Sequence, residues 1–244
     1  MSHGSPDREP PLQRCTSVLS RRLAPSWAAD VSLAVSAIWL GVVRPPIDRL
    51  LGTGLALATL PLQLLLLAAT WRAFGACPVI VQRRTGLNGR PFPLLKVRTL
   101  AGPDTSSENT LDWHHDPRRL AAFGAVVRRT GLDEILQVWN VAAGQMALIG
   151  PRPWLPQEQL AVERLLPEAR RRLAVRPGLI GLAAVLNRRP CGSDGYLAHA
   201  TADLEYVATA TPALDGRICW LALRVLMDGR DLTTGHVRSD AAES

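Results

Sequence analysis

Two uncharged apolar stretches stand near the start of the chain, and they differ in length. Residues 31–43 form the first, which is shorter than the roughly 17–25 residues of a spanning helix. Residues 50–71 form the second, and its 22 positions are long enough to cross the hydrocarbon core. Pro61 lies in the middle of the second stretch. Because proline lacks a backbone donor and clashes with the preceding turn, we expect a kink or break there.

Three topologies fit this pattern. Both stretches could span as a hairpin, the first could lie at the interface while the second enters and returns at Pro61, or residues 1–43 could form a signal-anchor. No small-residue cleavage motif follows Val43, so a removed signal peptide is not expected. The first two topologies place the basic tail and everything after residue 75 on the cytoplasmic side, as the positive-inside rule prefers.

Beyond residue 75 the pattern changes to short elements separated by turns. Asn88-Gly89 is a turn signal between two strand-like runs, which predicts a β-hairpin. From Leu132 to Trp139 apolar residues recur at i, i+3, i+4 and i+7, which predicts a helix with one apolar face. The elements expected here are strands at 79–81 and 92–97, a polar loop at 104–116, and helices at 132–141, 157–166 and 217–227.

The chain therefore divides into three parts. We expect a mobile, basic N-terminal tail at residues 1–27, membrane-associated segments at 28–73 with their break at Pro61, and a further domain at 74–244. The predicted fold class is α+β, mainly α: a membrane-anchored helical lobe with a small β-hairpin. The apolar run at 217–227 fits a core helix and equally a membrane-surface helix whose arginines reach lipid phosphates.

Charge narrows the choice of partners. The net charge is +7 and the pI about 10.2, so lipid head groups, nucleotides or nucleic acid are the expected classes. No basic patch with interleaved aromatic residues is present, so nucleic acid is ranked lowest. Among 28 basic side chains Lys96 is the only lysine, which indicates either a site that needs a compact ammonium or biased codon usage. The four cysteines lack metal-ligand or paired spacing and fit free thiols in a reducing cytoplasm.

The segment from Arg128 to Val141 carries the candidate chemistry. Thr130 and Asp133 resemble a capping box, in which a carboxylate in the first helical turn is favoured by about 0.3–1 kcal/mol. A second interpretation makes the same acid a nucleophile for a phosphorus centre, kept ionised by the helix dipole and by Arg128 and Arg129. The residues alone leave both interpretations open.

An ordered set of motifs runs through most of the chain beyond the tail. A piece such as Pro-Arg-Pro is a weak signal by itself, but a Leu-Asp-Glu block followed at short range by Gly-Pro-Arg-Pro is specific. On this set the chain resembles the monotopic phosphoglycosyl transferases, the bacterial sugar transferase family. The likeness runs from about residue 44 to 215 and includes Arg44…Asp48, Gln82-Arg83-Arg84-Thr85-Gly86, Gly89-Arg90-Pro91-Phe92, Lys96-Val97-Arg98-Thr99, the segment 128–141, Gly150-Pro151-Arg152-Pro153, Arg176-Pro177-Gly178, Arg188, Asp203 and Tyr206.

The resemblance implies a two-step reaction at a membrane. A nucleotide diphosphosugar, usually a UDP-sugar, is attacked at the phosphate next to the sugar and UMP leaves. The phosphosugar then passes from an aspartate to polyprenyl (undecaprenyl) phosphate, which starts the assembly of a surface glycan. The nucleophile maps onto Asp133, and Glu134 is the acidic partner that helps to hold Mg²⁺.

The resemblance also implies a location. Residues 74–244 would be a cytoplasmic catalytic domain on the bacterial inner membrane, with membrane lipids and glycan-assembly proteins as further partners to consider. The membrane segment would be a re-entrant helix–break–helix. Its break is often Ser-Pro in this family but is Leu60-Pro61 here, so Thr59 is the candidate partner for the freed backbone carbonyls.

Electrostatics agrees with such a site. A carboxylate that approaches a diphosphate meets like charge, so a divalent ion and fixed cations must mask it. Mg²⁺ uses few carboxylates together with substrate phosphates, which suits one acidic pair, Asp133 and Glu134. Arg152 stands between two prolines, so its guanidinium is aimed from an extended backbone. The candidate phosphate-binding residues are Lys96, Arg98, Arg128, Arg129, Arg152 and, by resemblance, Arg188.

The chain departs from the family pattern where polar residues are usual. Where the family usually has Gly-Asp-Met-Ser, Gln145 replaces the aspartate and Ala147 replaces the serine. Ile180 replaces a threonine, and Ala184 replaces a glutamine. These positions predict either a different sugar or reduced activity. Three functions therefore compete: an active transferase, a weakened relative that acts as a membrane scaffold, and a membrane-tethered nucleic-acid or anionic-lipid binder whose binding falls steeply with salt.

Overall fold

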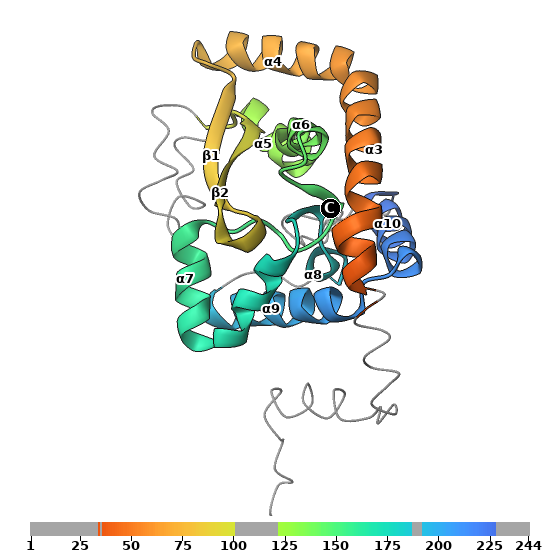
Figure 1. Cartoon of the computed structure of the whole chain (residues 1–244). Helices are drawn as coiled ribbons and strands as arrows, with labels where there is room; N and C mark the ends of the chain where they lie inside the picture. Colours follow the sequence, from red (N-terminus) through yellow and green to blue (C-terminus); the bar gives the residue numbers. More distant parts are fainter. Residues whose placement is uncertain (1–33, 35, 101–121, 187–191, 228–244) are drawn as a thin grey trace, which may run out of the picture.

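Helices make up most of the described chain. The structure is a computed structural model, and it describes residues 34, 36–100, 122–186 and 192–227 (Figure 1). This mainly helical fold with a small hairpin is the predicted class. In chain order the elements are η1 (Trp39–Val43), α3 (Arg44–Ala58), α4 (Leu60–Phe74), β1 (Val79–Thr85), η2 (Leu87–Gly89), β2 (Pro91–Val97), α5 (Ala122–Arg129), η5 (Leu132–Glu134), α6 (Gln137–Ala142), β3 (Ala147–Ile149), α7 (Pro156–Leu165), η6 (Pro167–Ala174), β4 (Gly178–Ile180), α8 (Leu182–Val185), α9 (Gly192–Thr209) and α10 (Pro212–Met227).

Several predicted elements can be compared directly. The hairpin is confirmed, and the helix expected at 157–166 is α7, after which Pro167 begins η6. The helix expected at 217–227 begins earlier, at Pro212. The tail at 1–27, the loop at 104–116 and Arg188 lie outside the described residues.

The apolar N-terminal region forms two helices joined at an angle. In Figure 1, α3 runs along one side of the lobe and α4 crosses its top. The pair, Ser36–Ala58 and Leu60–Phe74, is bent by 59°. Among the described residues no single helix has the length and hydropathy needed to cross a bilayer, but this bent pair satisfies both requirements together.

The bend lies at Thr59, two residues before Pro61. The proline therefore occupies the first turn of α4, where its missing N–H costs no helical hydrogen bond. Thr59 Oγ1 donates to Leu55 O at 2.6 Å. Gln63 Nε2 donates to Ala56 O at 3.2 Å and to Thr59 Oγ1 at 2.7 Å. The side chains of Thr59 and Gln63 thus donate hydrogen bonds to backbone carbonyls at the break. The sequence predicted this role for Thr59.

Both helices bury polar residues and expose apolar ones. Arg44, Asp48, Gln63 and Thr70 are buried against the lobe. A helix that faces water has the opposite distribution, so the outer surface of this pair is suited to an apolar environment. Its exposed large side chains are Ile47, Leu50, Leu51, Leu55, Leu57, Leu62, Leu64, Leu65 and Trp71.

A buried polar cluster fastens α3 to the C-terminal helices. Arg44 Nε pairs with Asp48 Oδ2 at 3.0 Å, and its Nη1 pairs with Asp215 Oδ2 at 3.4 Å. Arg44 also donates to the Tyr206 hydroxyl and to the Ile149 carbonyl. Tyr206 in turn donates to Asp215 Oδ1 at 2.8 Å. One guanidinium therefore joins the bent pair to β3, α9 and α10.

The helix predicted at 132–141 is interrupted, and this prediction is wrong in its detail. Leu132–Glu134 makes a single 3-10 turn, and α6 begins only at Gln137. Gly131, with φ of +71°, separates α5 from this turn. The apolar face survives the interruption, because Leu136 is buried in a cluster with Leu66, Val97 and Val127.

The capping interpretation of Thr130 and Asp133 is also wrong. Thr130 Oγ1 donates to Val126 O at 2.9 Å and to Val127 O at 3.1 Å, so it belongs to the end of α5. No side chain caps the 3-10 turn that contains Asp133. A turn of three residues has no appreciable dipole, so the charge of Asp133 must be balanced by side chains.

Candidate active site

One wall of the candidate site is the β-hairpin. β1 and β2 pair from Val79↔Val97 to Thr85↔Pro91, and Lys96 lies opposite Ile80. Opposed residues share a face, and residues two apart on one strand share it too. Gln82, Arg84 and Lys96 therefore project from the same face of the hairpin.

The opposite wall is the turn that contains the two acids. Lys96 Nζ lies 3.2 Å from Asp133 Oδ2 and 3.3 Å from Glu134 Oε1. Asn140 of α6 holds this wall against β2, since its Oδ1 accepts from Leu95 N at 3.0 Å and its Nδ2 donates to Pro93 O at 2.7 Å. The single lysine of the chain thus bridges both carboxylates.

Arg152 closes the site from a third direction. Its Nη2 lies 3.1 Å from Glu134 Oε1. The segment before it is fixed by a parallel pair, β3 with β4, that the sequence pattern did not predict. Gly150 N donates to Ile180 O and Gly178 N donates to Pro151 O, both at 2.9 Å. A Cβ on Gly178 would lie 2.0 Å from Gly150 N, so only glycine permits this approach.

The two carboxyl groups differ in their proton affinity. Burial raises the pKa of Asp133 above its usual value, although Lys96 and Arg128 oppose the effect. Burial acts in the same direction on Glu134, but the Arg152 and Lys96 cations outweigh it and lower the pKa of Glu134 to about 2. Glu134 is therefore the firmly ionised member of the pair, and Asp133 depends on neighbouring cations for its charge.

The other predicted phosphate-binding residues are placed differently. Arg128 Nε donates to Thr99 Oγ1 at 2.7 Å, and its positive charge acts on Asp133. Arg98 Nε donates to Cys77 O at 2.7 Å, at the start of the hairpin. Arg129 is exposed at the end of α5. The structure thus brings Lys96, Arg128 and Arg152 to the acidic pair.

A divalent ion fits the chemistry of this pair. Among the described residues no group of three or more His, Cys, Asp and Glu side chains gathers as a metal site. Mg²⁺ is commonly held by one or two carboxylates and completes its shell with water and substrate phosphates. Asp133 and Glu134, two adjacent carboxylates beside a cationic pocket, supply such a set.

Sequence reasoning missed two residues that line a pocket beside the acids, Arg84 and Gln137, and it missed Glu158, which lies beside Arg84. A pocket is lined by Arg84, Lys96, Glu134, Gln137 and Arg152, together with Leu94, Pro153, Gly178 and Leu179. Arg84 stands in one of the motifs that carry the family resemblance, but neither Arg84 nor Gln137 was predicted as a site residue. Glu158 lies 3.6 Å from Arg84 Nη1 and is separated from it by more than seventy positions. The spacing of Gln82 and Arg84 on a strand beside Lys96 was the available signal.

The four departures from the family pattern lie elsewhere. Ala147 is buried in β3, and Ile180 packs beside the cluster around Tyr206. Gln145 Oε1 accepts from Asn140 Nδ2 at 2.6 Å. None of these residues, nor Ala184, lines the pocket beside Glu134. Their changes therefore alter packing around the site rather than its described cationic lining.

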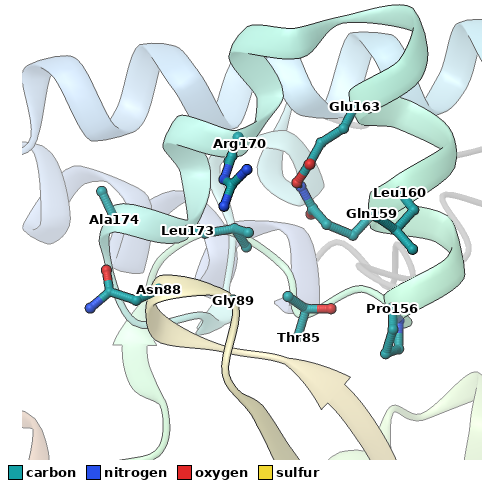
Figure 2. A pocket seen from close by; sticks show the side chains of 10 residues that line it. All are labelled: Thr85, Asn88, Gly89, Pro156, Gln159, Leu160, Glu163, Arg170, Leu173 and Ala174. Atoms are coloured by element: carbon teal, nitrogen blue, oxygen red, sulfur yellow. The ribbon is translucent and has the colours of Figure 1, made fainter.

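A larger pocket of about 580 Å³ lies beyond the turn end of the hairpin. Figure 2 shows Asn88 and Gly89 of the turn on one side, Gln159 and Glu163 of α7 on another, and Arg170 above. It contains none of the predicted site residues. The acidic pair is at the other end of the hairpin, where Val97 packs with Leu66 of α4.

The fold and the site define a protein with an exposed apolar helix pair and with cations gathered around two buried carboxylates. The chain belongs to the bacterial sugar transferase family, which matches residues 40–229.

Three relatives resemble the chain at 31% to 35% identity. A UDP-glucose:undecaprenyl-phosphate glucose-1-phosphate transferase of Xanthomonas campestris pv. campestris is 35% identical over 150 residues, which cover 59% of this chain and 31% of the relative. A transferase of the same name from Caulobacter vibrioides is 35% identical over 134 residues, with 52% and 48% covered. The exopolysaccharide production protein ExoY of Rhizobium meliloti is 31% identical over 182 residues, with 68% and 77% covered. The matched region thus spans 31% and 48% of the length of the first two relatives.

Proposed function

We propose that this protein transfers a sugar-1-phosphate from a nucleotide diphosphosugar, with a UDP-sugar as the expected donor, to polyprenyl phosphate. The observation that carries the proposal is the buried pair Asp133 and Glu134, bridged by Lys96 and held by Arg152. Relatives named as UDP-glucose:undecaprenyl-phosphate glucose-1-phosphate transferases support the choice of substrates. The product would be the first lipid-linked unit of a surface glycan.

The reaction proceeds in two displacements at one phosphorus atom. An Asp133 carboxylate oxygen attacks the phosphorus next to the sugar, and the bond to the bridging oxygen breaks, so the nucleoside monophosphate leaves with the bond electrons. A phosphate oxygen of the polyprenyl phosphate then attacks the same phosphorus and releases the Asp133 carboxylate. Charge is conserved in each step, and the phosphosugar ends on the lipid.

The cations make these attacks feasible. Lys96 lies within 3.3 Å of both carboxylates and keeps Asp133 ionised while it screens the approaching phosphate. Arg152 is oriented by the β3–β4 pair and already contacts Glu134. Its remaining N–H groups are placed to bind a non-bridging phosphate oxygen. A Mg²⁺ ion bound by Glu134 and Asp133 would supply further charge neutralisation on the diphosphate.

We also propose that the bent helix pair enters the cytoplasmic leaflet of the bacterial inner membrane and returns. Its exposed leucines and buried polar residues support a lipid environment. Val97, the residue after Lys96, packs with Leu66 of α4, so the acidic pair lies close to this helix. A site next to the membrane suits a substrate whose phosphate is attached to a lipid chain.

The test of the reaction is UMP release by the full chain in detergent with Mg²⁺, polyprenyl phosphate and a panel of UDP-sugars, beside Asp133→Asn. We expect release with one sugar, and its loss in the variant and without Mg²⁺. Without polyprenyl phosphate, a burst of UMP equal to the enzyme concentration would support the aspartyl intermediate. Absence of a burst would exclude that intermediate. No release by folded protein with any nucleotide sugar would favour the scaffold hypothesis.

The membrane topology has a separate test. A single cysteine at Pro46, in a variant without the four native cysteines, lies before the bend at the exposed start of α3. The re-entrant arrangement predicts no labelling by an impermeant thiol reagent in intact cells and full labelling after permeabilisation. Labelling of intact cells would instead indicate a spanning hairpin.

A further inference from the structure

Arg84 has one hydrogen-bond donor that the described protein leaves unused. Its Nη2 donates to Gln82 Oε1 at 2.9 Å, and its Nη1 donates to Pro153 O at 3.4 Å. Its Nε is buried and has no hydrogen-bond partner. A buried guanidinium N–H without an acceptor is costly, so the position favours a ligand that brings one.

The charge around Arg84 is also incompletely balanced. The nearest carboxylate oxygen, Glu158 Oε2, is 3.6 Å away. That carboxylate is already shared, since Oε2 accepts from Leu155 N and Oε1 accepts from the Tyr196 hydroxyl, each at 2.8 Å. Burial and the nearby Arg152 cation both lower the pKa of Arg84. An anion placed between the two arginines would relieve this repulsion.

The pocket beside Glu134 brings Arg84 together with two cations of the candidate site. Arg84, Lys96 and Arg152 line it, and Glu134 is the one carboxylate among its lining residues. Lys96 is the only one of the three cations that forms an ion pair with Asp133. The pocket has room for about 10 Å³, so the side chains around it must shift for a phosphate to enter. A diphosphate with its reacting phosphorus at Asp133 and Lys96 would then place its second phosphate toward Arg152 and Arg84.

We propose that Arg84 binds the phosphate that departs with the nucleoside, through its free Nε–H and an adjacent Nη donor. This inference rests on the proposed function and adds to it a residue for leaving-group binding. Glu158 and Gln82 are positioning residues, because they hold the guanidinium at the pocket from α7 and from its own strand. Charge placed at the departing oxygen atoms stabilises the first displacement as well as the bound donor.

The experiment compares Arg84→Met and Arg84→Lys with Arg83→Met in the full chain in detergent. Arg83 is a matched control, because it is exposed and projects from the other face of the same strand. UMP binding is measured by calorimetry with Mg²⁺ in an Asp133→Asn background. Steady-state KM values are measured for both substrates in chains with Asp133 intact.

We expect Arg84→Met to weaken UMP binding and to raise the KM for the nucleotide sugar by about 10- to 100-fold, the range of a charged hydrogen bond. The KM for polyprenyl phosphate should rise as well, because its phosphate attacks in line from the side that the nucleoside monophosphate has left. Arg84→Lys should fall between wild type and Arg84→Met, and Arg83→Met should match wild type.

Other outcomes overturn the inference in distinguishable ways. Misfolding of Arg84→Met would lower the active fraction and leave both KM values unchanged, and UMP binding at wild-type affinity in the remaining folded protein would then disprove the role. If wild-type protein neither releases nor binds UMP, the proposed function is wrong as well.

Discussion

At the scale of single residues, the site depends on a cation that the two carboxylates share. Lys96 pairs with both Asp133 and Glu134, while Arg152 pairs with Glu134 and the charge of Arg128 acts on Asp133. A guanidinium in place of Lys96 would be broader and could not approach both oxygens as a single point charge. The compact ammonium anticipated from the lone lysine is thus located where two acids converge.

Replacement of Lys96 tests this dependence. We expect Lys96→Met to lower the rate of UMP release at least about 100-fold, because an electrostatic contact at the reacting group is removed. Lys96→Arg should recover only part of the loss. Arg129→Met is the control, since Arg129 is exposed, and it should retain nearly full activity. A Lys96→Met rate close to that of the control would disprove the bridging role.

Sequence reasoning identified the residues that carry a motif and missed those that depend on pairing. Asp133, Glu134, Lys96 and Arg152 stand in recognisable blocks, and the structure brings them together. The role of Arg84 depends on the strand register, which no single stretch of sequence displays. Local sequence patterns do not predict a contact between residues of two separate elements.

At the scale of elements, the Gly-Pro-Arg-Pro segment is held by the closest backbone approach at the site. A Cβ at Gly178 would meet Gly150 N at 2.0 Å and Gly150 Cα at 2.6 Å. We expect Gly178→Ala to lower the free energy of unfolding by about 1–3 kcal/mol, because the strands must separate. Since Arg152 follows directly, UMP release should fall as well.

The control for Gly178→Ala is Gly216→Ala in α10. An added Cβ at Gly216 contacts nothing within 4 Å, and alanine is favoured over glycine in a helix by roughly 0.8–1 kcal/mol. Denaturant unfolding in detergent should therefore show opposite signs for the two substitutions. Equal stability of both variants would contradict the packing described for β3 and β4.

The sequence predicted elements correctly where a long pattern marked them. It failed where a single residue determined the end of an element. The hairpin was predicted from the turn residues Asn88-Gly89, and the end of α7 from Pro167. The helix at 132–141 was predicted whole because its apolar spacing continues across the break. Gly131 and the 3-10 turn divide it, and the spacing of apolar residues does not register that change. Strands of three residues, such as β3 and β4, are too short to show a period.

At the scale of the whole molecule, the bend is connected to the rest of the lobe through Gln63. This side chain contacts Thr59 and Ala56 at the break, and its Oε1 accepts from Trp139 Nε1 at 2.8 Å. Gln63→Leu should lower the free energy of unfolding by about 1–3 kcal/mol, because the partly buried indole N–H loses its acceptor. Leu64→Met at the next, exposed position should change stability by less than about 0.5 kcal/mol. Thermal unfolding in detergent measures both, and similar values would rule out the Gln63 link.

The Arg44 cluster makes a second connection between distant parts of the chain. Arg44→Met would leave Asp48 and Asp215 buried without their cation, which costs about 3–5 kcal/mol. We expect a large fall in the unfolding temperature. Arg72→Met at the exposed end of α4 removes the same charge without a buried partner and should be close to wild type. An Arg44→Met variant as stable as Arg72→Met would refute the fastening role.

The uniqueness of Lys96 has a consequence for chemical labelling. Apart from the amino terminus, its Nζ is the one primary amine of the chain. An amine-selective acylating reagent therefore modifies a single side chain, and a lysine-specific protease cuts once, into residues 1–96 and 97–244. Acylation blocks that cut, so the ratio of whole chain to fragments on a gel reports how accessible the Lys96 amine was. Any molecule that occupies the acidic pair should appear in such an assay as protection against acylation, with no need for turnover.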